Sequence, residues 1–111
     1  MKLRDRTLAQ RLNELTTQNE KLHAARQAYL LKDAARKHFE ARAIQSAPGK
    51  SHAERTVNAQ ATEDWRDYQM DVAQLEAAFE FEKLKYDILD KAWLAEYLGA
   101  KLDGDTIKRG T

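Results

Sequence analysis

The sequence has few residues that interrupt helices and none that crosslink chains. Its 111 residues include no cysteine, one proline and four glycines, and aromatic residues make up only 8%. The lack of cysteine excludes disulfides and thiolate metal sites. The scarcity of proline and glycine favours long uninterrupted helices. With 33% charged residues, the composition predicts an all-α protein of one small domain, residues 1–111.

Long apolar runs are also missing. The longest is a few residues, far short of the roughly 20 that a membrane-spanning helix needs. The first residues, Met1 to Arg6, are charged and lack the apolar centre of a signal peptide. We therefore expect a soluble protein with a cytoplasmic location.

The net charge of +1 hides an uneven distribution. Residues 1–45 carry ten Lys/Arg and five Asp/Glu, a balance of +5, whereas residues 61–100 carry four and ten, a balance of −6. Helices of opposite charge attract each other. The first part of the chain is therefore expected to lie against the last part, within one chain or between two copies.

The first long helix is expected over residues 7–43. Leu8, Leu15, Leu22 and Tyr29 recur every seven residues, and Leu12, Asn19 and Arg26 would fill the alternate position of a heptad seam. An asparagine inside such a seam fixes register at some cost in stability. A second stripe is rich in small residues and would allow close helix approach: Ala24, Ala28, Leu31, Ala35 and Phe39. Both stripes are compatible with an intramolecular core and with an intermolecular coiled coil.

A bend is expected over residues 46–50, where Pro48 and Gly49 disfavour helix. Ser51 and Glu54 have the spacing of a capping box, which predicts a short helix over residues 51–59. Residues 58–62 form a softer joint, at which the chain either breaks or runs on as helix.

The second long helix is expected over residues 63–98, followed by a polar tail over 99–111. Its apolar residues alternate steps of three and four, with Glu82 as the single charged interruption. A second apolar line follows another side: Ala77, Phe81, Leu84, Ile88, Ala95 and Leu98. A helix that is apolar on two sides contacts more than one neighbour.

Together these elements predict a helical hairpin or coiled coil, in which two long helices are joined by the Pro-Gly bend and the short helix. Such a hairpin buries little surface alone, so a homodimer is expected. The predicted oligomer interface lies on the last helix and comprises Trp65, Tyr68, Val72, Leu75, Phe79, Phe81, Leu84, Tyr86, Ile88, Leu89 and Trp93.

No pattern in the sequence predicts catalysis. The Gly49-Lys50-Ser51 triplet resembles the end of a phosphate-binding loop, but the position five before Gly49 is Ile44 rather than glycine, and no strand precedes it. None of the three histidines pairs with another at a metal-ligand spacing, and Asp64, Asp67 and Asp71 are best explained as a solvated acidic face. We expect a protein that is not an enzyme and has no catalytic, cofactor or metal site.

Nucleic-acid binding has a stronger basis. Basic residues are dense in the second half of the first helix and continue beyond the bend, and such a surface can follow phosphates. The candidate contact residues for DNA or a DNA-bound partner are Arg36, Lys37, Arg42, Lys50 and Arg55. Their charge is also compatible with solvation, or with pairing to the acidic helix.

Residues 45–97, which include "APGKSHAERTVNAQATEDWRDY" and "LEAAFEFEKLKYDILDKAW", resemble small helical proteins of phage and prophage genomes that are encoded near recombination and replication genes. The resemblance implies a non-enzymatic accessory protein in DNA recombination or replication, acting on DNA or on a DNA-handling protein in the host cytoplasm. One alternative is an inhibitor or adaptor that binds a host nuclease or defence effector without DNA contact, through Phe81, Leu84 and Ile88. Another is a structural coiled-coil scaffold.

Overall fold

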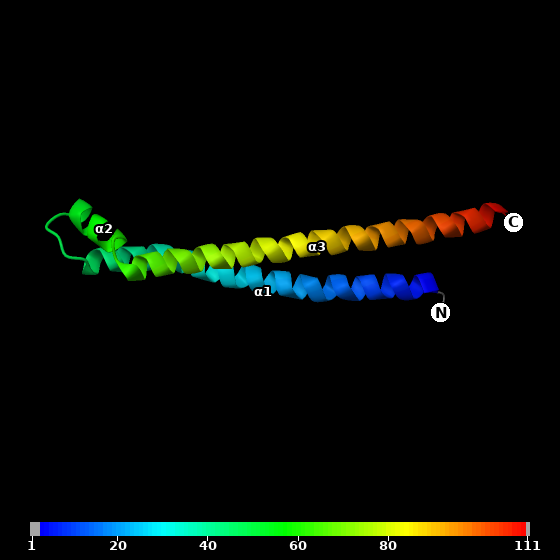
Figure 1. Cartoon of the computed structure of the whole chain (residues 1–111), viewed down its shortest axis with the longest axis horizontal. Helices are drawn as coiled ribbons and strands as arrows, with labels where there is room; N and C mark the ends of the chain where they lie inside the picture. The colour runs from blue at the N-terminus through cyan, green and yellow to red at the C-terminus, as the bar shows by residue number, and fades with distance from the viewer. Residues whose placement is uncertain (1–2, 111) are drawn as a thin grey trace. The chain divides into compact units, whose positions relative to one another are not determined.

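The chain folds into three α-helices, seen in a computed structural model that describes the backbone of residues 3–110 and the side chains of residues 7–103. They are α1 (Leu3–Ser46), α2 (His52–Gln60) and α3 (Glu63–Gly110) (Figure 1). No strand occurs within residues 3–110. The prediction of an all-α protein is confirmed.

The third helix is longer than the sequence predicts. A stop near Leu98 and a polar tail over residues 99–111 were expected, but α3 continues to Gly110. A glycine inside a helix costs only about 1 kcal/mol relative to alanine, and no proline follows Gly99 to end the helix. Residue 111, the last of the predicted tail, lies outside the described residues.

The joint between α2 and α3 is a true break in the helix. Gln60 ends α2 and Glu63 begins α3. The Thr62 hydroxyl donates to the carbonyl of Ala59 (2.7 Å) and accepts the backbone N–H of Trp65 (3.2 Å). Thr62 therefore caps the start of α3, as Ser, Thr, Asp and Asn commonly do.

The chain divides into two compact units, of which the first to be described comprises residues 24–79. Here α1 and α3 run antiparallel and pack through aromatic rings. Phe39 stacks on Tyr68 with ring centroids 4.2 Å apart, and Tyr29 stacks on Phe79 at 6.0 Å. The Tyr68 hydroxyl donates to the carbonyl of Lys32 (2.8 Å), whose ammonium group lies 4.4 Å from the same ring. These contacts bury the seam predicted for α3 against α1 of the same chain.

The other unit comprises residues 1–23 and 80–111. Its best-defined link between α1 and α3 is polar. Gln18, only 5% exposed, donates from its side-chain amide to the backbone carbonyl of Glu82 (3.1 Å) and to the Glu82 carboxylate. Further along α3, Trp93 and Tyr97 stack with centroids 5.4 Å apart.

The alternate positions of the α1 seam differ from the prediction. Leu12 is 51% exposed, and Arg26 is also exposed. Gln18, rather than Asn19, is the buried polar residue of the seam. The physical reason is that a seven-residue repeat of apolar residues identifies only one of the two core positions in each heptad. The second core position can lie either three or four residues further along the helix. Here Gln18 meets Glu82 at the step of three, where hydrogen bonds to Glu82 satisfy the buried Gln18 amide.

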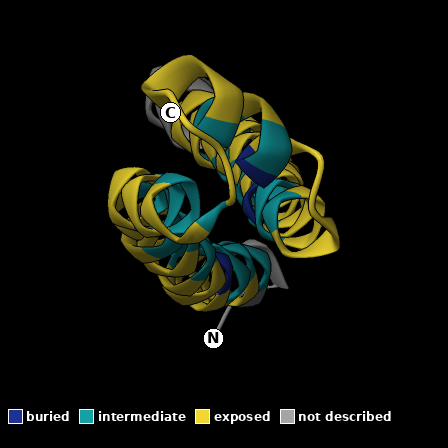
Figure 2. Cartoon of the chain, turned by 90° about the vertical axis from the view of Figure 1, so that its left-hand side faces the viewer, coloured by how far each residue is buried: buried dark blue, intermediate teal, exposed yellow. Residues whose placement is uncertain are grey.

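Little of the described chain is fully buried. Among residues 7–103 the buried apolar residues are Ala59 and Val72, at 1% and 4% exposure. Figure 2 accordingly shows exposed residues over most of the ribbon. No helix among the described residues is long and apolar enough to cross a membrane.

Candidate functional site

The turn from α1 to α2 depends on one glycine. Gly49 has a φ of +148°, which L-residues with side chains rarely adopt, and a Cβ there would lie 3.0 Å from both the backbone nitrogen and Cγ of Arg55. The Asn58 amide donates to the carbonyl of Pro48 (2.6 Å) and holds the turn against α2. Gly49 therefore allows the backbone to approach α2 closely.

The start of α2 uses the predicted capping pair in an altered form. Ser51 is the N-cap, and its hydroxyl accepts the backbone N–H of Glu54 (3.1 Å). The Glu54 carboxylate accepts the backbone N–H of Lys50 (2.8 Å), where a regular capping box predicts that of Ser51. The Lys50 side chain remains exposed beside the helix N-terminus.

A groove of about 580 Å³ lies where the last turns of α1 meet the first turns of α2. Its polar wall contains Lys37, Glu40, His52 and Arg55. Glu40, the one carboxylate in this wall, accepts a hydrogen bond from the Gln69 amide (2.9 Å). We call this feature the basic groove, defined by Lys37, His52 and Arg55.

The structure separates the five cations that the sequence suggests for DNA contact. Lys37 and Arg55 line the basic groove. Arg36 pairs with Asp33 at 3.0 Å, and Arg42 lines a different pocket. Within residues 7–103, Lys37, Arg42, Lys50 and Arg55 form no ion pair, although Arg55 donates to the carbonyl of Gly49 (3.5 Å). His52 belongs to the groove but was missed, since its position depends on the packing of α2 against α1.

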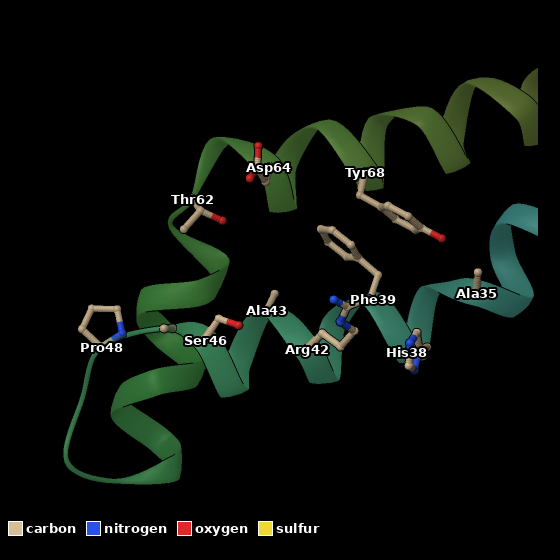
Figure 3. A pocket seen from close by; sticks show the side chains of 11 residues that line it. Ala35, His38, Phe39, Arg42, Ala43, Ser46, Pro48, Thr62, Asp64 and Tyr68 are labelled. Carbon is tan, nitrogen blue, oxygen red and sulfur yellow. The ribbon is translucent and has the colours of Figure 1, made fainter.

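That other pocket, of about 620 Å³, lies between α1, the turn and the start of α3 (Figure 3). Phe39 and Tyr68 form its apolar wall, and Arg42, His38 and Asp64 provide charged or polar groups at its edge. Arg42 and Asp64 come from opposite walls. Arg42 and Asp64 cancel in net charge, so this pocket is less suited to an anion than the basic groove, where Lys37 and Arg55 outnumber Glu40.

The predicted oligomer interface falls on two faces of α3. The first face is buried or half-buried and contacts α1 through Trp65, Tyr68 and Phe79; its other members are Val72, Leu75, Tyr86, Leu89 and Trp93. The second face contains Phe81, Leu84 and Ile88, which are 58%, 57% and 57% exposed. Only this second face remains open to a partner.

No group of three or more His, Asp or Glu side chains among residues 7–103 is arranged to hold a metal ion. Comparison of the chain with protein-family models, curated proteins and solved structures finds no match in any of the three. The site is therefore interpreted from its own chemistry.

Proposed function

We propose that the protein acts by binding, without catalysis, as a helical dimer that contacts DNA phosphates through the basic groove. It would serve as an accessory factor in DNA recombination or replication, of the kind found in phage genomes. The observation that carries this proposal is the convergence of Lys37, His52 and Arg55 in one groove, where the two cations outnumber the single carboxylate, Glu40.

Placement of charge matters here more than its total. Residues 24–79 carry eight Lys/Arg and eight Asp/Glu, so this unit has no net attraction for a polyanion. Along the helices, cations are neutralised in pairs such as Lys32–Asp71 (3.8 Å) and Arg36–Asp33 (3.0 Å). At the groove, by contrast, cations from α1 and α2 face the same space beside the positive end of the α2 dipole.

DNA is favoured over other polyanions for two reasons. A lysine and an arginine from two different helices provide two cations, and a DNA backbone offers a phosphate to each of them. The resemblance of residues 45–97 to phage proteins encoded near recombination genes also points to DNA.

The test is fluorescence anisotropy with a short labelled DNA duplex, titrated from about 50 to 200 mM salt. If Lys37, Lys50 and Arg55 each neutralise one phosphate, log K should fall against log salt with a slope of about −2.7. The K37Q/R55Q variant should reduce the magnitude of this slope by about 1.8 and weaken binding at the lower salt concentration.

The matched control is R66Q/K83Q, which removes the same number of positive charges from exposed positions of α3. It should leave the slope close to that of the unchanged protein. An equal loss of DNA affinity and salt slope in both variants would mean that binding depends only on total charge. The proposed role of the basic groove in DNA contact would then be wrong. Absence of binding by the unchanged protein at low salt would overturn the DNA proposal.

A further inference from the structure

The exposed face of α3 in the unit of residues 80–111 carries an unusually regular apolar stripe. Its members are between 47% and 64% exposed wherever they are large. We call it the α3 stripe; it comprises Phe81, Leu84, Ile88, Ala95, Leu98 and Leu102. Isolated exposed leucines are ordinary, but a contiguous apolar line of this length is typical of an interaction surface.

The stripe has the spacing of a coiled-coil seam. Steps of three and four connect its members, and Lys91 occupies the one polar position in the series. At 100° per residue the stripe lies roughly 150° around α3 from the residues that face α1, such as Glu82 and Leu89. A helix could therefore pack on the stripe without displacing α1.

We propose that a second copy of this chain covers the stripe, with the two α3 helices antiparallel. This inference deepens the dimer of the proposed function and rests on it. In the register we assign, facing residue numbers sum to 179. Phe81 then packs against Leu98 of the second copy and Leu84 against Ala95, each a large side chain against a smaller one, and Ile88 lies against the aliphatic stem of Lys91.

Charge disfavours one neighbouring register and the parallel direction. The edge position of Glu80, one residue before Phe81, lies beside that of Lys101, three residues after Leu98 on the second copy, and two-fold symmetry repeats the pair. Sliding one helix by a heptad, so that the seam residues that face each other sum to 172, brings Asp87 beside Asp87 on one edge of the seam and Lys85 beside Lys85 on the other. A parallel pairing sets Lys91 against Lys91 inside the seam. Like charges so placed are destabilising.

The exposed area also fits a second copy. The chain exposes 8548 Å², whereas a folded monomer of 12.8 kDa typically exposes about 6,300 Å². This excess on one chain is larger than the roughly 800 Å² that each partner of a stable pairwise interface buries.

The absence of cysteine makes disulfide trapping a clean test. The L84C/A95C variant should form a covalent dimer under mild oxidation, because the two positions face each other only between antiparallel copies. They cannot join within one chain, since eleven residues of helix separate them by about 16 Å. A95C alone should remain uncrosslinked, and K83C/D90C, on another face of α3, should do the same.

Light scattering, which measures the mass of the protein in solution, provides a second and independent test of the dimer. The unchanged protein should have twice the monomer mass of 12.8 kDa. The L84D variant should raise the dimer dissociation constant at least tenfold, with no change in helicity by circular dichroism. Its matched control is L31D, because Leu31 on α1 is equally accessible at 65% exposure and lies outside the stripe.

Each outcome decides between arrangements. Crosslinking by A95C alone would replace the antiparallel pairing with a parallel one. A dimer that neither pair traps would overturn this register while leaving the proposed dimer in place. If the protein is a monomer, the proposal that a second copy covers the stripe is wrong, and the stripe is assigned to a different partner, such as a host protein. The test of DNA binding at the basic groove is not affected by this result.

Discussion

Val72 offers a direct measure of how strongly the two long helices are held together. It is 4% exposed on the face of α3 that packs against α1. Val72→Ala removes two methyl groups, which loses about 1.6 kcal/mol of transfer free energy. The space left behind, about 50 Å³ if nothing relaxes, adds about 1 kcal/mol. We expect a total loss near 2–3 kcal/mol before any change in helix propensity.

The same substitution at Val57 is the control, because this valine also lies in a helix but is 64% exposed. Alanine favours helix over valine by roughly 0.6 kcal/mol, and this gain applies at both positions and cancels in the comparison. Thermal and urea unfolding followed by circular dichroism should show V72A less stable than V57A by about 2–3 kcal/mol. That difference corresponds to a midpoint roughly 10 °C lower. Equal stability of the two variants would refute the packing of this face against α1.

Two further predictions concern the turn and the buried polar pair. Gly49→Ala should lower the free energy of unfolding by about 1–3 kcal/mol and speed amide exchange in α2, because the added Cβ would meet the backbone of Arg55. As a control, Gly99→Ala inside α3 should instead stabilise the protein by up to about 1 kcal/mol. The hydrogen bond from Gln18, and then that from Lys85, lowers the pKa of Glu82 below its ordinary value of 4.5. The stabilisation by Glu82 is therefore present above pH 4.5 and is lost as the pH falls through the lowered pKa. Unfolding between pH 7 and 2 should show a steeper acid loss for the unchanged protein than for E82Q, and parallel curves would contradict the pairing.

The sequence was most informative where one periodicity ran without interruption. Alternating steps of three and four along α3 identified the buried face correctly, because every member from Trp65 to Trp93 is buried or half-buried. In α1 the same periodicity favours Leu12 and Asn19, because leucine is apolar and asparagine commonly fixes register in a coiled-coil seam. The structure uses Gln18, whose partner Glu82 is 64 residues away in sequence, and local spacing contains no information about such a pairing.

The candidate site shows a similar limit. Lys37 and Arg55 were identified by their charge, but that property alone could not separate them from Arg36, which is neutralised by Asp33 one helical turn away. The contribution of His52 depends on how the turn at Gly49 places α2 against α1. Charge density along a chain predicts where cations are abundant, whereas their convergence requires the tertiary fold.

The two tryptophans lie in different units, one in each. Trp65 is near Phe39 in the unit of residues 24–79, and Trp93 stacks on Tyr97 in the other. Replacing either one by phenylalanine leaves a single tryptophan, whose fluorescence can be excited selectively over that of the four tyrosines and reports on one unit alone. Coincident fluorescence transitions of the two single-tryptophan proteins would mean that the units melt cooperatively, and separated transitions would rank their stabilities without any added label.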